Sequence, residues 1–465
     1  MPTNLVLGIP PAILQLVQEG LIERAFHDGL YPALQYRAEA MVEEWPANTG
    51  TNLFMSRPGL LAPIVTPLAA GVDPVPQTVS YEQWEARLER YAGTIDTHMP
   101  TSAVANANQF LRNIHQLGLQ AGQSLNRIPR NTLFKAYLSG HTVTIDPALA
   151  GALTLHVAAL NGFTDVVLPG STVRPALVSA ATPLPITISF AGEPANTVVG
   201  FIADDPNDPF GPGFIQLGAA TVNPLPARTP VLSTARPDII RSGGGDSIDA
   251  LGAADTFVLQ DAINAVNRLR RHNLQPHEDG FFHAHISPDS NSQVFTDPAF
   301  QRLNTALPEH HIYHEGFIGT ISGIMFFMNT ESPDNLNVGP LTPTGVSALY
   351  GRDIGAEVVN NGNIRVGRIL VTGRGTLYEK WLNESAYVSE AGITGKVGEF
   401  DVVNSGISVL TERIRLILRA PLNRLQDAVA ATWSISTSFP TPSDVTAGSG
   451  PQRFKRGLVI EHALG

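Results

Sequence analysis

Cysteine is absent from the sequence, and this absence excludes several kinds of chemistry at once. A chain without Cys has no disulfide, no thiolate metal site and no cysteine nucleophile. Lysine is scarce, because it accounts for only four of the 30 basic residues: Lys135, Lys380, Lys396 and Lys455. An excess of Arg favours planar, bidentate contacts within interfaces, although a base-composition bias of the coding genome explains it equally well.

Long apolar runs and excess positive charge are missing as well. No stretch approaches about 18 consecutive apolar residues, and residues 1–11 have neither a basic region nor a cleavable apolar region, so we expect no membrane span and no secretion signal. Affinity for nucleic acid comes largely from clustered Lys and Arg, whereas this chain has a formal net charge of −11. We therefore expect the chain to tolerate DNA without binding it sequence-specifically.

The signatures of several enzyme classes are missing too. The sequence contains no GxSxG, SxxK or HExxH motif, and no GxGxxG in a strand–helix setting. Residues 243–245 are three glycines without a following GK[ST], so we interpret them as a connector and not as a phosphate loop. Asp204, Asp205 and Asp208 lack the register of a calcium loop, and we interpret them as a turn between strands.

Six of the 13 histidines lie close together in the sequence. They are His277, His283, His285, His310, His311 and His314. His283 and His285 would share one face of a strand, and His310 and His314 one face of a helix, so the spacing permits a zinc or nickel site. Histidines in such regions are more often packed or hydrogen-bonded. We therefore predict no metal, no cofactor and no catalytic residue.

The chain does have 465 residues, 43% of them hydrophobic, which is enough for two or three domains with their own cores. Its central element is a helix within residues 101–138, where apolar residues recur at helical spacing and Thr101 or Ser102 can cap the start. Counted to Arg127 this helix has about 26 residues and a length of roughly 39 Å. Pro129 should end it or kink it before a last turn.

The region before this helix predicts a projecting hairpin. Residues 11–27 predict an amphipathic helix and residues 36–45 a strand, after which residues 46–80 hold six prolines and fit no regular element. Residues 79–99 predict a return strand mixed with a short helical turn. A floppy surface loop is the alternative, but the tip is too apolar for a solvated linker, so we expect another molecule to cover it.

The rest of the chain divides into an all-β part and an α/β part. Residues 141–235 contain short alternating runs between turns, with 12 prolines, and predict a β-sandwich or barrel. A helix in residues 256–272, a strand in residues 280–286, helical turns after Pro288 and a strand pair in residues 316–330 follow. The remainder is mainly strands, which should form a closing sheet against the central helix.

Arg413, Arg415 and Arg419 alternate with apolar residues, which predicts a strand with one apolar face and one guanidinium face. The guanidinium face has two interpretations of equal weight. It is either an ordinary solvated sheet face or a face that meets Asp or Glu of a neighbouring subunit.

The order of these elements resembles that of the major capsid proteins of tailed bacteriophages, and in particular of coat proteins with an inserted β domain. The likeness rests on DGLYPALQYRAEAM before the hairpin, RPGLLAPIVTPLAAGVDP at its tip and SYEQWEARLERYAGTIDTHMP after it. It extends through FFHAHISPDSNSQVFTDPAF, HEGFIGTISGIMFFMNT and RFKRGLVIEHA, and so covers most of the chain apart from residues 141–235. The resemblance implies an α+β fold of the tailed-phage and herpesvirus capsid type.

The resemblance also implies a division of the chain into six segments. They are an N-terminal arm (1–35), an extended hairpin loop (36–99), the spine helix of a peripheral domain (100–140), an inserted all-β domain (141–235), an axial domain (236–395), and a peripheral-domain sheet with the C-terminal strand (396–465). The arm and the loop would lie over adjacent subunits. The contacts between subunits that we predict are Phe54, Arg57, Leu60, Leu61, Ile64, Asp73, Arg413, Arg415 and Arg419.

Some relatives join a Lys of the extended loop to a neighbouring Asn, but residues 46–80 contain no Lys, so that link cannot form here. The function implied is non-enzymatic: pentamers and hexamers of the chain form the icosahedral head shell of the virion around double-stranded DNA, after assembly in the host cytoplasm. The chain does not begin with a long charged helical segment, so we expect a separate scaffolding protein, along with a portal and a cement or decoration protein. The alternatives are the shell of a cellular nanocompartment and a His-ligated metal hydrolase with a β-sandwich accessory domain.

Overall fold

The computed structural model describes most of the chain outside several loops and its ends. The described residues are 20–30, 35–46, 49–58, 61, 64–69, 71–79, 81–98, 109–167, 172–173, 175–305, 319–329, 360, 362–383, 396–397, 400–403, 406–411, 413–419, 428–442 and 456–464. The chain divides into two compact units. The first comprises Met1–Leu53, Glu85–Arg130 and Leu377–Pro440, and the second Phe54–Trp84, Asn131–Thr376 and Thr441–Gly465.

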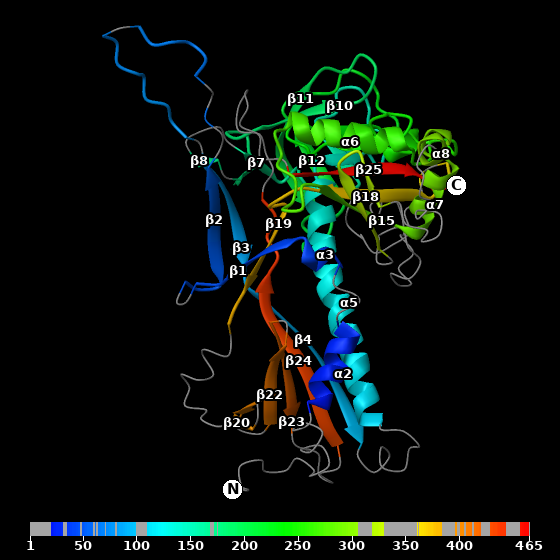
Figure 1. Ribbon diagram of the computed structural model, residues 1–465. Coiled ribbons are helices and arrows are strands. Elements are labelled where there is room, and N and C mark those ends of the chain that lie inside the picture. Colours follow the sequence, from blue (N-terminus) through cyan, green and yellow to red (C-terminus); the bar gives the residue numbers. More distant parts are fainter. Residues whose placement is uncertain are drawn as a thin grey trace. The chain divides into compact units, whose positions relative to one another are not determined.

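The first unit is built on an eight-stranded sheet (Figure 1), in which the strand order is β1-β19-β24-β23-β22-β21-β20 and β4 pairs with β24 off this path. Its strands are β1 (Ala40–Glu44), β4 (Glu89–His98), β19 (Leu377–Trp381), β20 (Lys396–Val397), β21 (Phe400–Val403), β22 (Gly406–Thr411), β23 (Ile414–Arg419) and β24 (Ala428–Ser438). The β4–β24 pairing is antiparallel and runs from Glu89 opposite Thr437 to His98 opposite Ala428.

Two helices, α2 (Leu21–Leu30) and α5 (Gln109–Tyr137), pack against strands of this sheet. Their shared core consists of Ile22, Phe26, Leu30, Phe110, Ile114, Leu117, Ala121, Leu125, Ile414, Leu416, Leu418, Val429, Ala431, Trp433 and Ile435. The expected closing sheet against the central helix is therefore confirmed for β23 and β24. The chain also belongs to the expected α+β class, because its helices pack against sheets whose pairings are mainly antiparallel.

The central helix α5 has 29 residues and continues through Pro129 to Tyr137. Of the two predictions for this proline, an end or a kink before a last turn, the end is therefore wrong. The residues where we expected the helix to start, 101–108, lie outside the described residues. A close approach between α2 and α5 depends on glycine, since a Cβ on Gly118 would lie 2.3 Å from the carbonyl oxygen of Phe26. Gly118, which weakens an isolated helix, is therefore required by packing here.

The elements before β2 differ in part from the prediction. The structure describes the arm helix only from Leu21, and the buried face of this helix is formed by Ile22, Phe26 and Leu30. Residues 11–19 lie outside the described residues. Where a single strand was expected in residues 36–45, a short helix α3 (Gln35–Ala38) precedes β1. Only the second half of that prediction is therefore correct.

The paired part of the hairpin is shorter than the sequence predicted. A strand β2 (Asn52–Pro58) lies within residues 46–80, where we expected no regular element, and it pairs with β3 (Tyr81–Arg87). The return segment holds β3 and β4 with no helical turn between them, so that expectation is wrong. Since β1 and β4 belong to the eight-stranded sheet, the paired part of the hairpin is β2 and β3 alone.

Residues 141–235 form a closed six-stranded β-barrel within the second unit. Its strand order is β5-β13-β10-β11-β12-β6, and all pairings are antiparallel. Its strands are β5 (His141–Val143), β6 (Thr154–Val157), β10 (Leu184–Ile188), β11 (Asn196–Ala203), β12 (Gly213–Leu217) and β13 (Pro230–Ser233). The first and last strands meet at a bridge between Thr144 and Val157, so of the two predicted architectures the barrel is correct.

The barrel interior is filled by apolar side chains from alternate positions. In β10 and β12 every second residue is buried, as the alternating sequence predicted. The core comprises Leu155, Val157, Leu160, Phe163, Val166, Val178, Leu184, Ile186, Ile188, Val198, Ile215, Leu217, Leu225 and Val231. Short strands β7 (Asp165–Val167), β8 (Thr172–Val173) and β9 (Pro175–Leu177) lie outside the barrel sheet; β7 pairs with β9, and β8 with β3.

A second six-stranded sheet in this unit has the order β14-β25-β18-β15-β17-β16. Its strands are β14 (Ile239–Arg241), β15 (Phe282–Ile286), β16 (Thr320–Ile321), β17 (Ile324–Met328), β18 (Val366–Thr372) and β25 (Gly457–Ala463). We expected β25 in the closing sheet, and this is wrong, because it lies between β14 and β18 with all seven residues buried. The reason is that both faces of β25 are buried. Leu458 and Ile460 lie in an apolar core. The buried Glu461 pairs with Arg241 on β14 and Arg368 on β18.

The helices and turns around this second sheet agree with the sequence. They are η2 (Ile248–Ala250), α6 (Leu259–Arg271), α7 (Pro288–Thr296) and α8 (Pro298–Thr305). Residues 243–245 all have positive φ and form a connector, as expected. None of the helices within the described residues is long and apolar enough to cross a membrane. The six-segment division of the chain stays a prediction.

Candidate functional site

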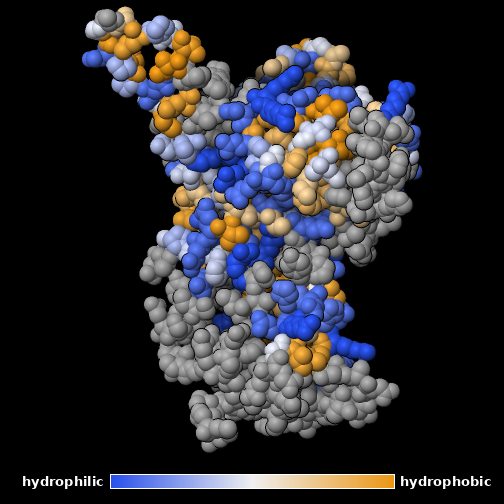
Figure 2. Space-filling view, viewed as in Figure 1, coloured by the Kyte–Doolittle hydropathy of each residue, from blue (hydrophilic) through white to orange (hydrophobic). Residues whose placement is uncertain are grey.

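We call residues 59–80, between β2 and β3, the finger. Its described residues, 61, 64–69 and 71–79, form neither a helix nor a strand. Figure 2 shows apolar side chains gathered along this segment, the blue loop beyond β2 in Figure 1. The exposed fractions of its large apolar side chains are 50% for Leu61, 74% for Ile64, 86% for Val65, 59% for Leu68, 55% for Val72 and 85% for Val75.

Such exposure is unusual for a contiguous segment. Single apolar residues on a surface need no explanation, but a run of them marks a surface that another molecule covers. Two further exposed aromatics flank the finger, Phe54 on β2 at 65% and Tyr81 on β3 at 46%. Of the predicted contacts, Phe54, Leu61 and Ile64 are thus exposed, whereas Leu60 lies outside the described residues.

The base of the finger, in contrast, is held by a buried ion pair. Arg57 Nε on β2 donates to Glu82 Oε2 on β3 at 2.6 Å, and the Arg57 guanidinium lies 5.7 Å from the centre of the Trp84 ring. Arg57 is 7% exposed and Glu82 is 0% exposed. The charge of Arg57 therefore has an acidic partner in its own chain, which makes this residue an anchor for the finger.

The finger carries a single charge, that of Asp73, which is exposed. From residue 58 to residue 86 the chain has no Lys, Arg or His. A surface that covers the finger must therefore offer apolar groups for the valines and, at one point, a cation for Asp73.

The predicted guanidinium strand is β23. Its apolar face is confirmed, because Ile414, Leu416 and Leu418 are at most 1% exposed. Arg413 precedes the strand with φ of 68° and donates from Nη2 to Glu379 Oε2 at 3.1 Å. This acidic partner comes from the same chain. Arg415 is partly buried, and the side chain of Arg419 lies outside the described residues.

Glu379 is shared with a second arginine. Arg37 donates from Nη2 to Glu379 Oε1 at 2.6 Å, and both side chains are almost completely buried. A buried carboxylate between two guanidinium groups stabilises the fold only as a set, because removing one partner leaves a charge in the interior. Arg413 thus has a role within its own subunit, although we expected its face to meet solvent or a neighbour.

Of the six clustered histidines, the structure describes His277, His283 and His285, and all three contact other rings. The rings of His277 and His283 stack with their centres 4.0 Å apart, and His283 Nε2 pairs with Asp279 Oδ2 at 2.7 Å. His285 is 1% exposed and stacks on Phe327. His310, His311 and His314 lie outside the described residues.

A different histidine, His156, forms a bridge that we did not predict. Its Nδ1 lies 2.6 Å from Asp146 Oδ2, its Nε2 lies 2.9 Å from Asp204 Oδ2, and its ring stacks on Phe214 at 4.4 Å. Burial opposes the charge on His156, but the two carboxylates outweigh burial and raise the pKa of the ring. A neutral imidazole has one N–H, so only the protonated ring donates to both carboxylates.

This bridge crosses the seam where the barrel closes. The seam holds two backbone hydrogen bonds, from the N–H of Ile145 to the carbonyl of His156 and from the N–H of Ala158 to the carbonyl of Val143. Asp146 follows β5, whereas His156 lies on β6. The run Asp204 to Asp208 is a turn, as expected, in which Asp205 Oδ1 accepts a hydrogen bond from the N–H of Asn207.

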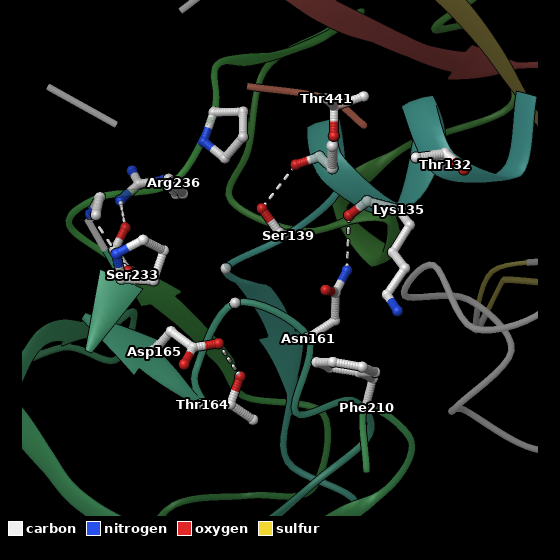
Figure 3. A pocket seen from close by; sticks show the side chains of 16 residues that line it. Thr132, Lys135, Ser139, Asn161, Thr164, Asp165, Phe210, Ser233, Arg236 and Thr441 are labelled. Atoms are coloured by element: carbon white, nitrogen blue, oxygen red, sulfur yellow. Dashed lines mark hydrogen bonds between the residues drawn. The ribbon is translucent and has the colours of Figure 1, made fainter. Parts of the chain in front are cut away.

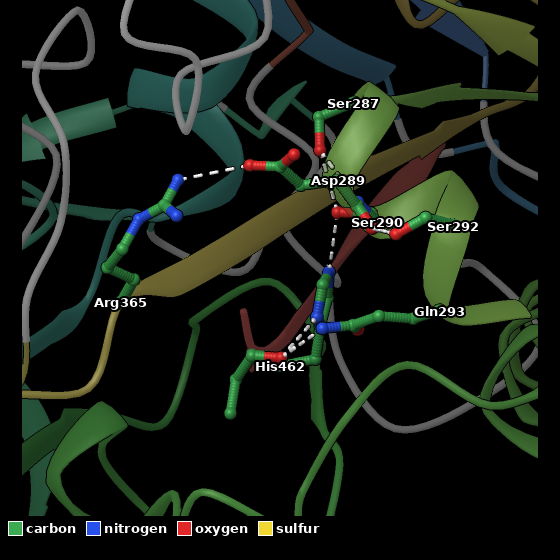
Figure 4. Close-up of polar contacts among 8 residues, drawn as sticks. Ser287, Asp289, Ser290, Ser292, Gln293, Arg365 and His462 are labelled. Carbon is green, nitrogen blue, oxygen red and sulfur yellow. Dashed lines mark hydrogen bonds and ion pairs between the residues drawn. The ribbon is translucent and has the colours of Figure 1, made fainter. Parts of the chain in front are cut away.

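A buried serine and histidine lie where α7 meets β25 (Figure 4). Ser290 Oγ and His462 Nε2 are 2.9 Å apart, and the Ser287 hydroxyl caps α7 by accepting from the N–H of Ser290. Both Ser290 and His462 are 0% exposed, and burial lowers the pKa of His462 to about 4. Because solvent does not reach this pair, its geometry ties α7 to β25 and does not form a reaction site.

A cavity of about 290 Å³ opens beside the barrel within the second unit (Figure 3). We call it the Lys135 cavity. It is lined by the end of α5, by the loops around Asn161 and Phe210, and by residues 233–237. Its volume is near the lower limit of roughly 300 Å³ for ligand pockets.

Comparisons with known proteins complete this description. No protein-family model and no curated protein matches the chain. Among solved structures, the capsid of Ralstonia phage GP4 is similar at 12% sequence identity and a TM-score of 0.43, over 92% of this chain and 88% of that chain. The capsid of cyanophage P-SCSP1u is similar at 9% identity and a TM-score of 0.45, over 92% of this chain and 88% of that chain. The cyanophage Pam1 capsid is similar at 9% identity and a TM-score of 0.44, over 94% of this chain and 92% of that chain.

Proposed function

We propose that this chain is the major capsid protein of a tailed bacteriophage. In this proposal it is a structural, non-enzymatic coat subunit that assembles with copies of itself, as pentamers and hexamers, into the icosahedral head shell around double-stranded DNA. The observation that carries the proposal is the finger, a segment with six large apolar side chains that are each at least half exposed. A segment of this composition needs a cover, and a sister subunit supplies one in a closed lattice.

The energetics favour a lattice over a single strong contact. Fully burying a Val, Leu or Ile side chain contributes roughly 1.5–3 kcal/mol. Part of this gain is offset when the finger loses its freedom on binding. The remainder is modest for each subunit, but a closed shell repeats the contact at every position. Many weak contacts of this kind give a stable assembly that still corrects its errors during growth.

The charge of the chain supports the same function. A shell that contains DNA needs an inner surface that does not hold the polyanion, and a net charge of −11 meets this requirement. We propose that the subunit assembles in the host cytoplasm with a separate scaffolding protein, a portal and a cement or decoration protein. The remaining predicted contacts, Asp73, Arg415 and Arg419, stay part of this proposal.

The experiment that tests the proposal is electron microscopy of the recombinant full-length protein. We expect large closed particles from the wild-type chain. The triple variant Ile64→Ser, Val65→Ser and Val75→Ser should lose these particles, because the change removes apolar surface from the finger. The far-UV circular dichroism spectrum of the variant should stay that of the wild type, since all three side chains are exposed in the subunit.

The matched control is Thr66→Ser with Thr78→Ser, which alters the same segment without removing large apolar groups. This control should assemble normally. Particles from the triple variant equal to those of the wild type would contradict the proposal. Particles that enclose an enzyme and no DNA in the source cell would indicate a nanocompartment shell, and a monomer with stoichiometric zinc would indicate the hydrolase.

A further inference from the structure

The Lys135 cavity has an unusual floor, in which a lysine side chain lies against an aromatic ring. Lys135 is on the last turns of α5, and its Nζ lies 3.6 Å from the centre of the Phe210 ring. The Asn161 side chain holds this turn by donating from Nδ2 to the carbonyl of Lys135 at 2.8 Å. Phe210 itself is 36% exposed, so its ring is open to an incoming group.

The ammonium group of Lys135 is poorly hydrated. Burial lowers the pKa of Lys135, and the attraction of Asp208 only partly opposes this effect. A carboxylate that entered the cavity would replace the missing water and favour the charged lysine. The floor of the cavity therefore suits an anion more than a neutral polar group.

The remaining walls suit an extended, proline-rich chain. Pro175 and Pro237 contribute apolar surface, and Arg236 adds a second cation to the lining, where its Nη1 donates to the carbonyl of Ser233. The one carboxylate in the lining, Asp165, accepts a hydrogen bond from the Thr164 hydroxyl at 2.9 Å (Figure 3). Aromatic and proline surfaces are typical of grooves that bind polyproline-like segments.

The finger contains a segment with the complementary features. Residues 72–76 read VDPVP, so a lone carboxylate lies between two exposed valines. Pro74 and Pro76 fix their own φ angles and restrict Asp73 and Val75 to extended conformations. Such a segment is already close to its bound shape, and it loses little entropy when it docks.

We infer that the Lys135 cavity receives residues 72–76 of a second copy of this chain, with the Asp73 carboxylate at the Lys135 ammonium group and the valines and prolines against Phe210, Pro175 and Pro237. Charge complementarity selects this occupant, because Asp73 is the only charged residue of the finger and Lys135 is a desolvated cation. The inference rests on the proposed function in that it names the surface that covers the finger.

The first test measures docking without assembly. It uses the full-length chain with the triple serine change in the finger, and a synthetic peptide of residues 69–79, in a calorimetric titration. We expect saturable binding that weakens about tenfold with an Asp73→Asn peptide and about tenfold with Lys135→Met in the chain, since a charge-assisted hydrogen bond is lost in both cases. A Thr78→Ser peptide should bind like the wild-type peptide. The inference would be overturned if neither charge change altered the affinity, or if no binding occurred at millimolar peptide.

The second test exchanges the two charges in assembling protein. Asp73→Lys and Lys135→Glu should each reduce particle yield at least tenfold, because each places like charges together, and the double variant should recover most of the yield. Melting temperatures of the single variants separate lost docking from lost folding. If wild-type particles form and both single variants also assemble fully, the docking site is wrong while the coat function stands. If the wild type forms no particles, the proposed function fails, and the peptide titration still decides the docking site.

Discussion

The finger and the barrel are similar in composition and opposite in structure. The finger holds four prolines, and residues 141–235 hold 12, and both stretches have few charges. Yet the barrel buries 14 apolar residues in one core, whereas the finger leaves six large apolar side chains at least half exposed. The difference lies in the order of apolar and polar residues. Only in the barrel strands do they alternate, and this alternation gives the sheet one apolar face.

The comparison teaches that a low-charge, proline-rich stretch becomes either a core or a contact surface according to its periodicity. In β10 the residues at positions 184, 186 and 188 all point inward, so the strand has a face to bury. The finger offers no such face, because its apolar residues do not alternate with polar ones and its prolines remove backbone donors. Its burial therefore requires a surface that the finger does not itself build.

The largest loss of stability should come from breaking the buried ion pair between Arg57 and Glu82 at the base of the finger. Arg57→Met leaves the carboxylate of Glu82 buried without its partner, which costs about 3–5 kcal/mol. We expect the amides of β2 and β3 to lose their protection in hydrogen exchange, while those of the barrel keep theirs. Replacing both residues, Arg57→Met with Glu82→Leu, should restore much of the protection, because no buried charge then remains.

The next prediction compares the loss of stability when an apolar side chain is shortened in the barrel and in the finger. Ile186→Ala in the barrel removes a completely buried side chain and should cost about 2–5 kcal/mol. Val75→Ala in the finger removes a side chain that is 85% exposed and should change stability by less than about 0.5 kcal/mol. Chemical denaturation of the two variants, followed by hydrogen exchange of barrel amides, measures both. A comparable loss for Val75→Ala would mean that the finger packs within its own subunit.

The smallest effect concerns the seam of the barrel and depends on pH. The pKa of His156 is raised in the folded protein, so the bridge contributes fully below the usual histidine pKa of about 6.5 and is lost as the pH rises through the higher folded value. The contribution should stay below about 1 kcal/mol because the carboxylates are partly exposed. Hydrogen exchange of Ile145 and Ala158 should report the opening.

His156→Gln should remove this pH dependence and leave the seam at its weaker, high-pH level throughout. His27→Gln on α2 is the matched control, since it also replaces a histidine without touching the barrel. An unchanged pH profile in His156→Gln would show that the bridge does not hold the seam.

Elements with a strong local period were predictable. The helices α5 and α6 and the strands β10 and β12 follow directly from the spacing of their apolar residues. The sequence left open whether α5 would end at Pro129 or continue beyond it, because packing of the helix on both sides of the proline decides whether one missing backbone hydrogen bond is tolerated. Strand β2 was missed because the prolines and glycines around it conceal a seven-residue strand.

Contacts between distant residues were not predictable. Strand β25 pairs with β14, more than 200 positions earlier, and no local pattern states which sheet an apolar strand will join. Distant contacts at the site were not predictable either. The proline-rich, apolar sequence of the finger predicted a projecting segment, but the partners of Arg57 and Arg413 are carboxylates 25 and 34 positions away. His156 gave no signal, because its two aspartates lie on either side of it, 10 and 48 positions away.

Closure of the barrel has a consequence for crowding. A sheet that ends in free strands offers backbone donors and acceptors to any similar strand nearby, and subunits held side by side in large numbers would meet such strands constantly. The bridge between Thr144 and Val157 joins the first and last strands by two backbone hydrogen bonds. Fewer backbone groups of the barrel are therefore open to a strand of a neighbouring subunit, and its association depends more on side chains.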